Sequence, residues 1–184
     1  MGQRLIARWS DWSGALTEHL VLRRTLDCII GEGVVVSSAD EAFAARYRIV
    51  CDPGWRARTV EVDLIGSERQ LCLTCRGDGL WFNAESEVQP QLNGAVDVDL
   101  SATPFTNTLP IRRLGLNPGE SAEIAAVYVR LPELTVETDL QRYTCLVAGR
   151  RYRYESLDND FMREIETDDN GLVTLYPGLF RRIL

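Results

Sequence analysis

Apolar and polar residues alternate with a period of two through most of this 184-residue chain. The alternation is clearest over residues 16–23, 46–51, 59–64 and 124–131. Because successive side chains of a strand point to opposite faces, each segment predicts a half-buried strand. Turn signals such as Gly31-Glu-Gly33 and Asp52-Pro-Gly54 separate these segments. We therefore predict an all-β chain with about a dozen mostly antiparallel strands, in one strongly curved sheet that forms an incomplete barrel or β-roll.

Two short segments carry helical signals. Residues 38–45 predict a short capped turn or helix, and the residues after Thr106 predict a second helix that ends at Gly115. No linker-like run of Pro, Ser or Gly interrupts the chain, so we expect a single domain over residues 1–184. Similar patterning of residues 16–23 and 124–131 also raises the hypothesis of an internal duplication, with β-rich halves near 1–94 and 95–184.

The residue inventory excludes several classes of function. All 20 basic residues are arginines, which excludes Schiff-base chemistry and a P-loop lysine. With His19 as the single histidine, a multi-histidine metal site is excluded, and we predict neither a metal nor a cofactor. The net charge of −7 disfavours nucleic acid as a partner, and no apolar run approaches the length of a membrane span. Five cysteines and no signal peptide predict free thiols in a cytoplasmic protein.

Polar side chains are concentrated in residues 97–114, DVDLSATPFTNTLPIRRL. The segment begins as a strand in which Asp97 and Asp99 face the same side, and it ends in Arg112 and Arg113. This mixture of carboxylates, hydroxyls, an amide and guanidiniums suits a polar ligand head group. It suits equally well a buried polar network that fixes the fold, in which the aspartates pair with the arginines. Both interpretations remain open at this level.

Charged residues also occur on the apolar sides of two other strands. Glu18 shares a face with Leu20, and Arg58 shares a face with Val60. A buried charge needs a partner, so we expect an Arg58–Glu18 or Arg58–aspartate pair, or a ligand anion at Arg58. Tyrosines such as Tyr154 are able to stack on sugars, although most strand aromatics belong to the core. The candidate ligand-binding residues are therefore Asp97, Asp99, Thr103, Thr106, Asn107, Arg112, Arg58, Glu18 and Tyr154, with no catalytic residue among them.

Five stretches of the chain resemble, in order and spacing, the bacterial putative glycolipid-binding family. They are CDPGWRARTVEV (51–62), DVDLSATPFTNTLPIRRLGL (97–116), QRYTCL (141–146), YRYES (152–156) and GLVTLYPGLFRR (171–182). The resemblance implies a non-catalytic protein that binds an amphipathic ligand such as a glycolipid. In this interpretation residues 103–114 close one end of the roll and take the head group, while the inner face of the sheet takes the acyl chain.

Two alternatives from other functional classes remain. One is an enzyme that acts on a sugar or phosphate compound through Asp97, Asp99 and Glu18, because paired acids can hydrolyse glycosides without histidine or lysine. The other is a protein–protein interaction module that has no small ligand.

Overall fold

One continuous sheet organises the protein. The computed structural model describes residues 2–39, 41–77 and 79–184, and in these residues 14 strands follow the order β7-β6-β5-β4-β3-β2-β1-β14-β13-β12-β11-β10-β9-β8. Every neighbouring pair is antiparallel except β8 and β9. The strands are β1 (Gln3–Asp11), β2 (Leu16–Arg24), β3 (Ile29–Ser37), β4 (Phe43–Cys51), β5 (Ala57–Leu64), β6 (Gln70–Arg76), β7 (Leu80–Phe82), β8 (Asp97–Leu100), β9 (Ser121–Arg130), β10 (Thr135–Val147), β11 (Arg151–Ser156), β12 (Met162–Thr167), β13 (Val173–Tyr176) and β14 (Phe180–Arg182).

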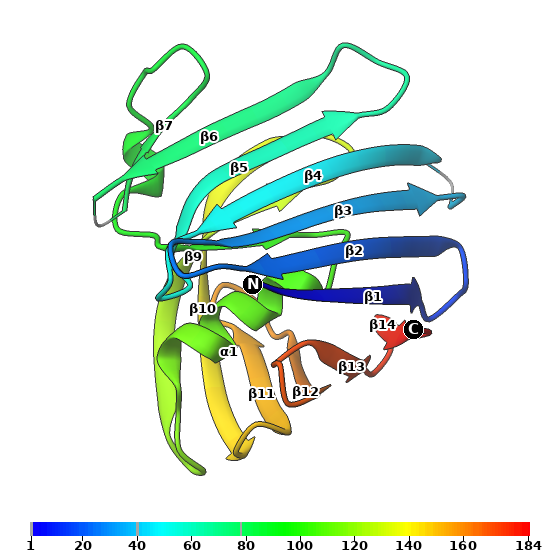
Figure 1. Ribbon diagram of the computed structural model, residues 1–184, viewed down its shortest axis with the longest axis vertical. Coiled ribbons are helices and arrows are strands. Elements are labelled where there is room, and N and C mark those ends of the chain that lie inside the picture. The colour runs from blue at the N-terminus through cyan, green and yellow to red at the C-terminus, as the bar shows by residue number, and fades with distance from the viewer. Residues whose placement is uncertain (1, 40, 78) are drawn as a thin grey trace.

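The sheet has two arms that curl toward each other (Figure 1). Strands β1–β7 form one arm and β8–β14 the other, and the two are joined by the pairing of β1 with β14. The arms meet again where the Ala57 N–H donates to the Val96 carbonyl at 2.9 Å, but no strand ladder forms there. With 56% strand, 7% helix and a sheet that does not close, the predicted all-β incomplete barrel is confirmed.

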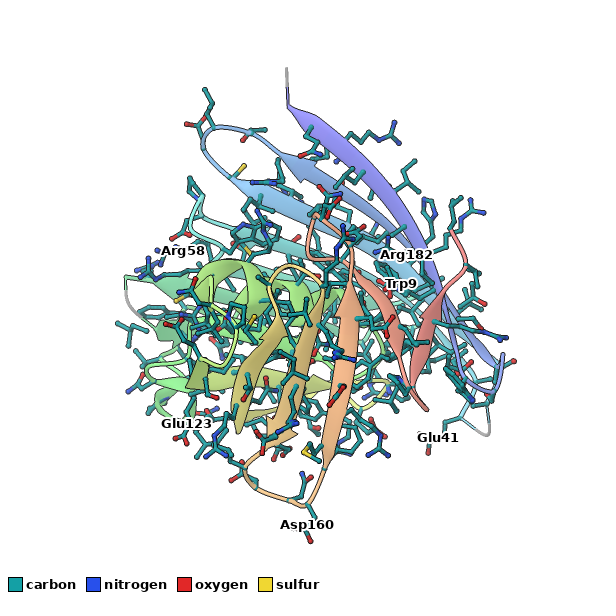
Figure 2. All side chains as sticks on the ribbon, turned by 90° about the horizontal axis from the view of Figure 1, so that it is seen from below. Trp9, Glu41, Arg58, Glu123, Asp160 and Arg182 are labelled. Atoms are coloured by element: carbon teal, nitrogen blue, oxygen red, sulfur yellow. The ribbon has the colours of Figure 1, made fainter. Side chains whose placement is uncertain are left out.

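Alternation along the strands decides which side chains form the core. In β2, for example, Leu20 and Leu22 are buried, whereas His19, Val21 and Arg23 are more exposed. Trp9 is fully buried at the junction of the arms, and its indole N–H donates to the Val173 carbonyl at 2.7 Å. Figure 2 shows Arg182 beside Trp9, with its guanidinium 5.6 Å from the ring centroid. These contacts fasten β1 to the last two strands of the chain.

Residues 101–114, here called the inner segment, lie within the curve of the sheet. They contain the 3₁₀ turn η2 (Phe105–Asn107) and the helix α1 (Thr108–Leu114), which is seen between the two arms in Figure 1. A second 3₁₀ turn, η1 (Pro90–Leu92), precedes β8. Helix α1 ends at Gly115, whose φ of 57° is a left-handed conformation that favours glycine, as predicted.

Glycines in β3 make room for the inner segment. A Cβ atom on Gly31 would lie 2.3 Å from a ring carbon of Phe105, and one on Gly33 would lie 2.3 Å from the ring of Tyr47. The Tyr47 and Phe105 rings are themselves stacked, with centroids 6.4 Å apart. The interpretation of Gly31-Glu-Gly33 as a turn was therefore wrong. These glycines lie inside a strand because two aromatic rings approach its backbone closely.

The helix predicted over residues 38–45 was also wrong. Phe43, Ala44 and Ala45 begin β4 and pair with the end of β3, while Asp40 lies outside the described residues. Alanine favours helices, but pairing with a long neighbouring strand outweighs that local preference here. Among the described residues, no helix has the length and apolar character needed to cross a membrane.

Candidate functional site

A cleft of about 570 Å³ lies at the end of the roll where the β9–β10, β11–β12 and β13–β14 turns gather. Helix α1 fills the opposite end, near Trp55 and Gly171. The volume falls within the range usual for small-molecule sites. The lining residues are Asp99, Leu100, Ser101, Thr103, Asn107, Tyr128, Arg130, Glu137, Thr138, Asp139, Tyr154, Ser156, Asp158, Asn159, Phe161, Tyr176, Leu179 and Phe180.

A shared amide donor joins two carboxylates in the cleft. The Gln141 Nε2 group donates to Oδ2 of Asp99 and to Oδ2 of Asp139, at 2.8 Å in each case. The Thr106 hydroxyl donates to the other oxygen of Asp99 at 2.9 Å, which fixes that carboxylate from two sides. The Tyr154 hydroxyl donates to Asp139 at 3.4 Å. Side chains from β8, β10, β11 and the inner segment therefore meet at one point.

Burial changes the proton affinity of these carboxylates. It raises the pKa of Asp99 to about 6, although hydrogen bonds from Thr106 and Gln141 act in the opposite direction. Burial also raises the pKa of Asp139, and the negative charge of Asp158 adds to this rise. Both groups therefore hold protons more strongly than ordinary aspartates.

Aromatic rings form the deeper wall of the cleft. Tyr154 packs edge-to-face against Tyr143, Phe161 and Tyr176, with centroid distances of 5.5, 5.9 and 6.4 Å. Burial, followed by the charges of Asp99 and other neighbours, raises the pKa of Tyr154 far above its ordinary value. Its hydroxyl therefore remains a hydrogen-bond donor at neutral pH.

The cleft carries an excess of negative charge. Asp99, Glu137, Asp139 and Asp158 line it, against Arg130 as the single basic lining residue. Arg130 lies 3.8 Å from Glu137. Within the described part of the chain, no basic side chain pairs with the three aspartates. Phosphate and sulfate groups are accordingly disfavoured as ligands.

Five of the residues that the sequence singled out lie in or directly behind the cleft. Asp99, Thr103, Asn107 and Tyr154 line it, and Thr106 holds Asp99 from behind. The buried Asn107 amide oxygen accepts from the Tyr143 hydroxyl at 3.0 Å, and its nitrogen donates to the Pro104 carbonyl at 3.4 Å. The polar network and the cleft thus share residues.

The other four candidates lie elsewhere, and two of them, Asp97 and Arg112, have partners of their own. Asp97 is buried and accepts hydrogen bonds from Arg113, whose Nε is 3.1 Å from both carboxylate oxygens. The predicted pairing of this aspartate with a nearby arginine is thereby observed. The Arg112 guanidinium lies over the ring of Trp55, at 5.9 Å from its centroid, and does not line the cleft. In both cases the role that the structure shows is packing or pairing.

Arg58 pairs with Asp52 at 2.7 Å, at the turn between β4 and β5. The expected Arg58–aspartate pair is present, whereas the alternative pair with Glu18 was wrong. Glu18 lies elsewhere because β2 is three strands away from β5 in the sheet. Figure 2 places Arg58 at the edge of the molecule, away from Trp9.

Glu18 is fully buried on β2 and fastens the inner segment to the first arm. Its Oε1 accepts from the Tyr47 hydroxyl and, at 2.7 Å, from the Thr103 hydroxyl. Its Oε2 has no hydrogen-bond partner among the described residues. Burial raises the pKa of Glu18 to about 7. Of the three carboxylates considered for an enzyme, Asp99 alone lines the cleft.

Several residues in or behind the cleft were missed from the sequence. Glu137 and Asp139 line the cleft, Gln141 is buried behind it, and the three alternate along β10 on the face that carries the buried Tyr143. Polar residues on the inward face of a strand were the available signal, because such positions are normally apolar. Asp158 lies in the turn after β11 and carries no comparable signal. Within the described residues, no three histidine, cysteine or acidic side chains are grouped to hold a metal ion.

Comparisons with known proteins place the chain in a family. Residues 6–182 match the family described as putative glycolipid-binding. A crystal structure of a DUF1089 family protein from Pseudomonas aeruginosa is similar to this chain, with 35% identity and a TM-score of 0.78, over 95% of this chain and 92% of that one. No curated protein matches the chain. Because the family match spans nearly the whole sequence, the resemblance is confirmed, and the chain belongs to the putative glycolipid-binding family.

Proposed function

We propose that this protein binds an amphipathic ligand such as a glycolipid and holds the polar head group in the cleft. The observation that carries the proposal is the cleft itself, a space of about 570 Å³ lined by both hydrogen-bonding groups and aromatic rings. Ligand sites of this kind combine apolar walls with a few polar groups that fix orientation. The family description supports a glycolipid as the ligand class.

The packed interior limits what the cleft can hold. Phe105, Leu109 and Ile111 of the inner segment are buried and occupy the space that the sheet encloses. An acyl chain lying along the inner face, as expected from the sequence, would have to displace them. We therefore place the head group in the cleft and direct the chain outward past the rim, where Leu179 is 36% exposed.

The chemistry of the lining suits a sugar. Carboxylates such as Asp99 and Asp139 accept hydrogen bonds from hydroxyl groups. The Asn107 amide keeps one N–H and one oxygen lone pair beyond its bonds to Pro104 and Tyr143. Aromatic rings such as that of Tyr128 provide an apolar surface for the carbon face of a sugar ring. This combination favours a polyhydroxylated head group over a purely apolar ligand.

Titration with octyl β-D-glucoside below its micellar concentration tests the proposal by isothermal calorimetry. We expect saturable binding that the Tyr128→Ala variant weakens at least tenfold. Leu26→Ala is the control, because Leu26 is 94% exposed, lies between β2 and β3, and does not line the cleft. Equal loss in both variants, or no binding of the wild-type protein to the glucoside and to a bacterial lipid extract, would contradict the proposal. The second result would favour a protein–protein module.

A further inference from the structure

Three aspartates gather at the cleft, of which Asp99 and Asp139 are half-buried and Asp158 is exposed. Asp97 pairs with Arg113, and Asp168 pairs with Arg182 at 2.7 Å. In the described part of the chain, Asp99, Asp139 and Asp158 face the cleft without any such basic partner. Carboxylates gathered in a partly buried space repel one another, and a cation would relieve that repulsion.

The shape and lining of the cleft indicate which kind of cation fits. No three acidic, histidine or cysteine side chains of the described residues are grouped closely enough for a metal ion. The space of about 570 Å³ is far larger than a bare ion requires. Four rings also line it, those of Tyr128, Tyr154, Phe161 and Tyr176, of which Tyr128 and Phe161 already lie under the guanidiniums of Arg130 and Arg163. Aromatic rings attract organic ammonium groups. An amine carried by a larger organic molecule therefore fits both the charge and the walls.

We propose that the head group bound in the cleft carries a protonated amine, as in an amino sugar, and that the ammonium lies beside Asp139 and Asp158. This inference rests on the proposed binding function and narrows its ligand class. The ammonium supplies up to three N–H donors to carboxylates that lack a basic partner, while the sugar hydroxyls bond to Asp99 and Asn107. Acetylation of the amine removes the charge, and a phosphate group introduces repulsion.

Calorimetric or NMR titrations with D-glucosamine, N-acetyl-D-glucosamine, D-glucose and D-glucose 6-phosphate at pH 7.0 and low salt test the inference. We expect D-glucosamine to bind at least tenfold more tightly than the neutral sugars, and the phosphate to bind most weakly. The preference for the amine should shrink in Asp139→Asn and persist in Asp169→Asn, because the Asp169 side chain is 84% exposed and outside the cleft. Asp158→Asn provides a second variant if Asp139→Asn does not fold.

The outcomes separate this inference from the proposed function. Equal affinity for D-glucosamine, N-acetyl-D-glucosamine and D-glucose overturns the inference that the head group carries an amine, and it leaves the proposed binding function intact. If neither D-glucosamine nor octyl β-D-glucoside binds, both the inference and the proposed function are overturned. Binding of spermidine without binding of any sugar shows a cation site and overturns the amino-sugar class. A tenfold preference that survives Asp139→Asn and Asp158→Asn overturns the assigned position of the ammonium.

Discussion

Replacement of Glu18 by glutamine is expected to change how the stability of the protein depends on pH. The buried carboxyl group has its pKa raised from 4.5 to about 7, mainly by desolvation. The polar groups that face it are the hydroxyls of Tyr47 and Thr103, both of which donate to Oε1. Glutamine keeps an oxygen acceptor at that position and cannot ionise.

The magnitude follows from the difference in proton affinity between the folded and unfolded states. The folded protein holds the Glu18 proton more tightly, so this contribution to stability is complete below pH 4.5 and is lost as the pH rises through 7. At about 1.4 kcal/mol for each pKa unit, the loss totals about 3 kcal/mol. Most of this loss falls between pH 5 and pH 8. The unpartnered amide hydrogens of the glutamine add a cost that does not vary with pH.

Urea unfolding of the wild-type protein and Glu18→Gln at pH 5, 6, 7 and 8 measures this effect. The difference between their unfolding free energies should move by about 2–3 kcal/mol in favour of the variant as the pH rises. Glu41→Gln is the control, because Glu41 is exposed at the periphery in Figure 2. If the difference in unfolding free energy between the wild type and Glu18→Gln stays constant from pH 5 to pH 8, the argument that burial raises the pKa of Glu18 is refuted.

Two further substitutions test the packing around the inner segment. Asp97→Ala should destabilise the protein by about 2–4 kcal/mol, because Arg113, whose side chain is 17% exposed, would lose its carboxylate partner; a melting temperature equal to or above that of the wild type would exclude this role. Gly31→Ala should cost about 1–3 kcal/mol in denaturant unfolding, because the new methyl group meets the Phe105 ring. Gly54→Ala, whose nearest contact would be 3.3 Å away, should cost less, and equal losses would count against the close-approach argument.

Much of the fold could be predicted because local patterns specify it. The period of two assigned the long strands and their buried faces, as in β2 and β5. Gly115 marked the end of α1, because a left-handed residue after a helix favours glycine. The pairing of Asp97 with an adjacent arginine followed from the cost of burying an unpartnered charge.

The remaining features depend on contacts that are distant in sequence. Gly31 faces Phe105 from 74 residues away, a close approach that no local rule distinguishes from a turn. The cleft was only partly predicted, because β10 and the turn after β11 supply Asp139 and Asp158. The polar stretch of residues 97–114 indicated one wall of the cleft through Asp99 and Asn107, but the curvature of the sheet decides which residues face that wall.

Native mass spectrometry of the protein, purified without detergent from cells that make it naturally, tests ligand binding in the cleft most directly. The account predicts an adduct with the mass of an amphipathic, sugar-bearing lipid on the wild-type protein and on Leu26→Ala, whose substituted side chain is 94% exposed and outside the cleft. The same adduct should be lost or much reduced in Tyr128→Ala, because Tyr128 lines the cleft. A wild-type protein that carries no adduct, and takes up none from a lipid extract of the same cells, would contradict the account.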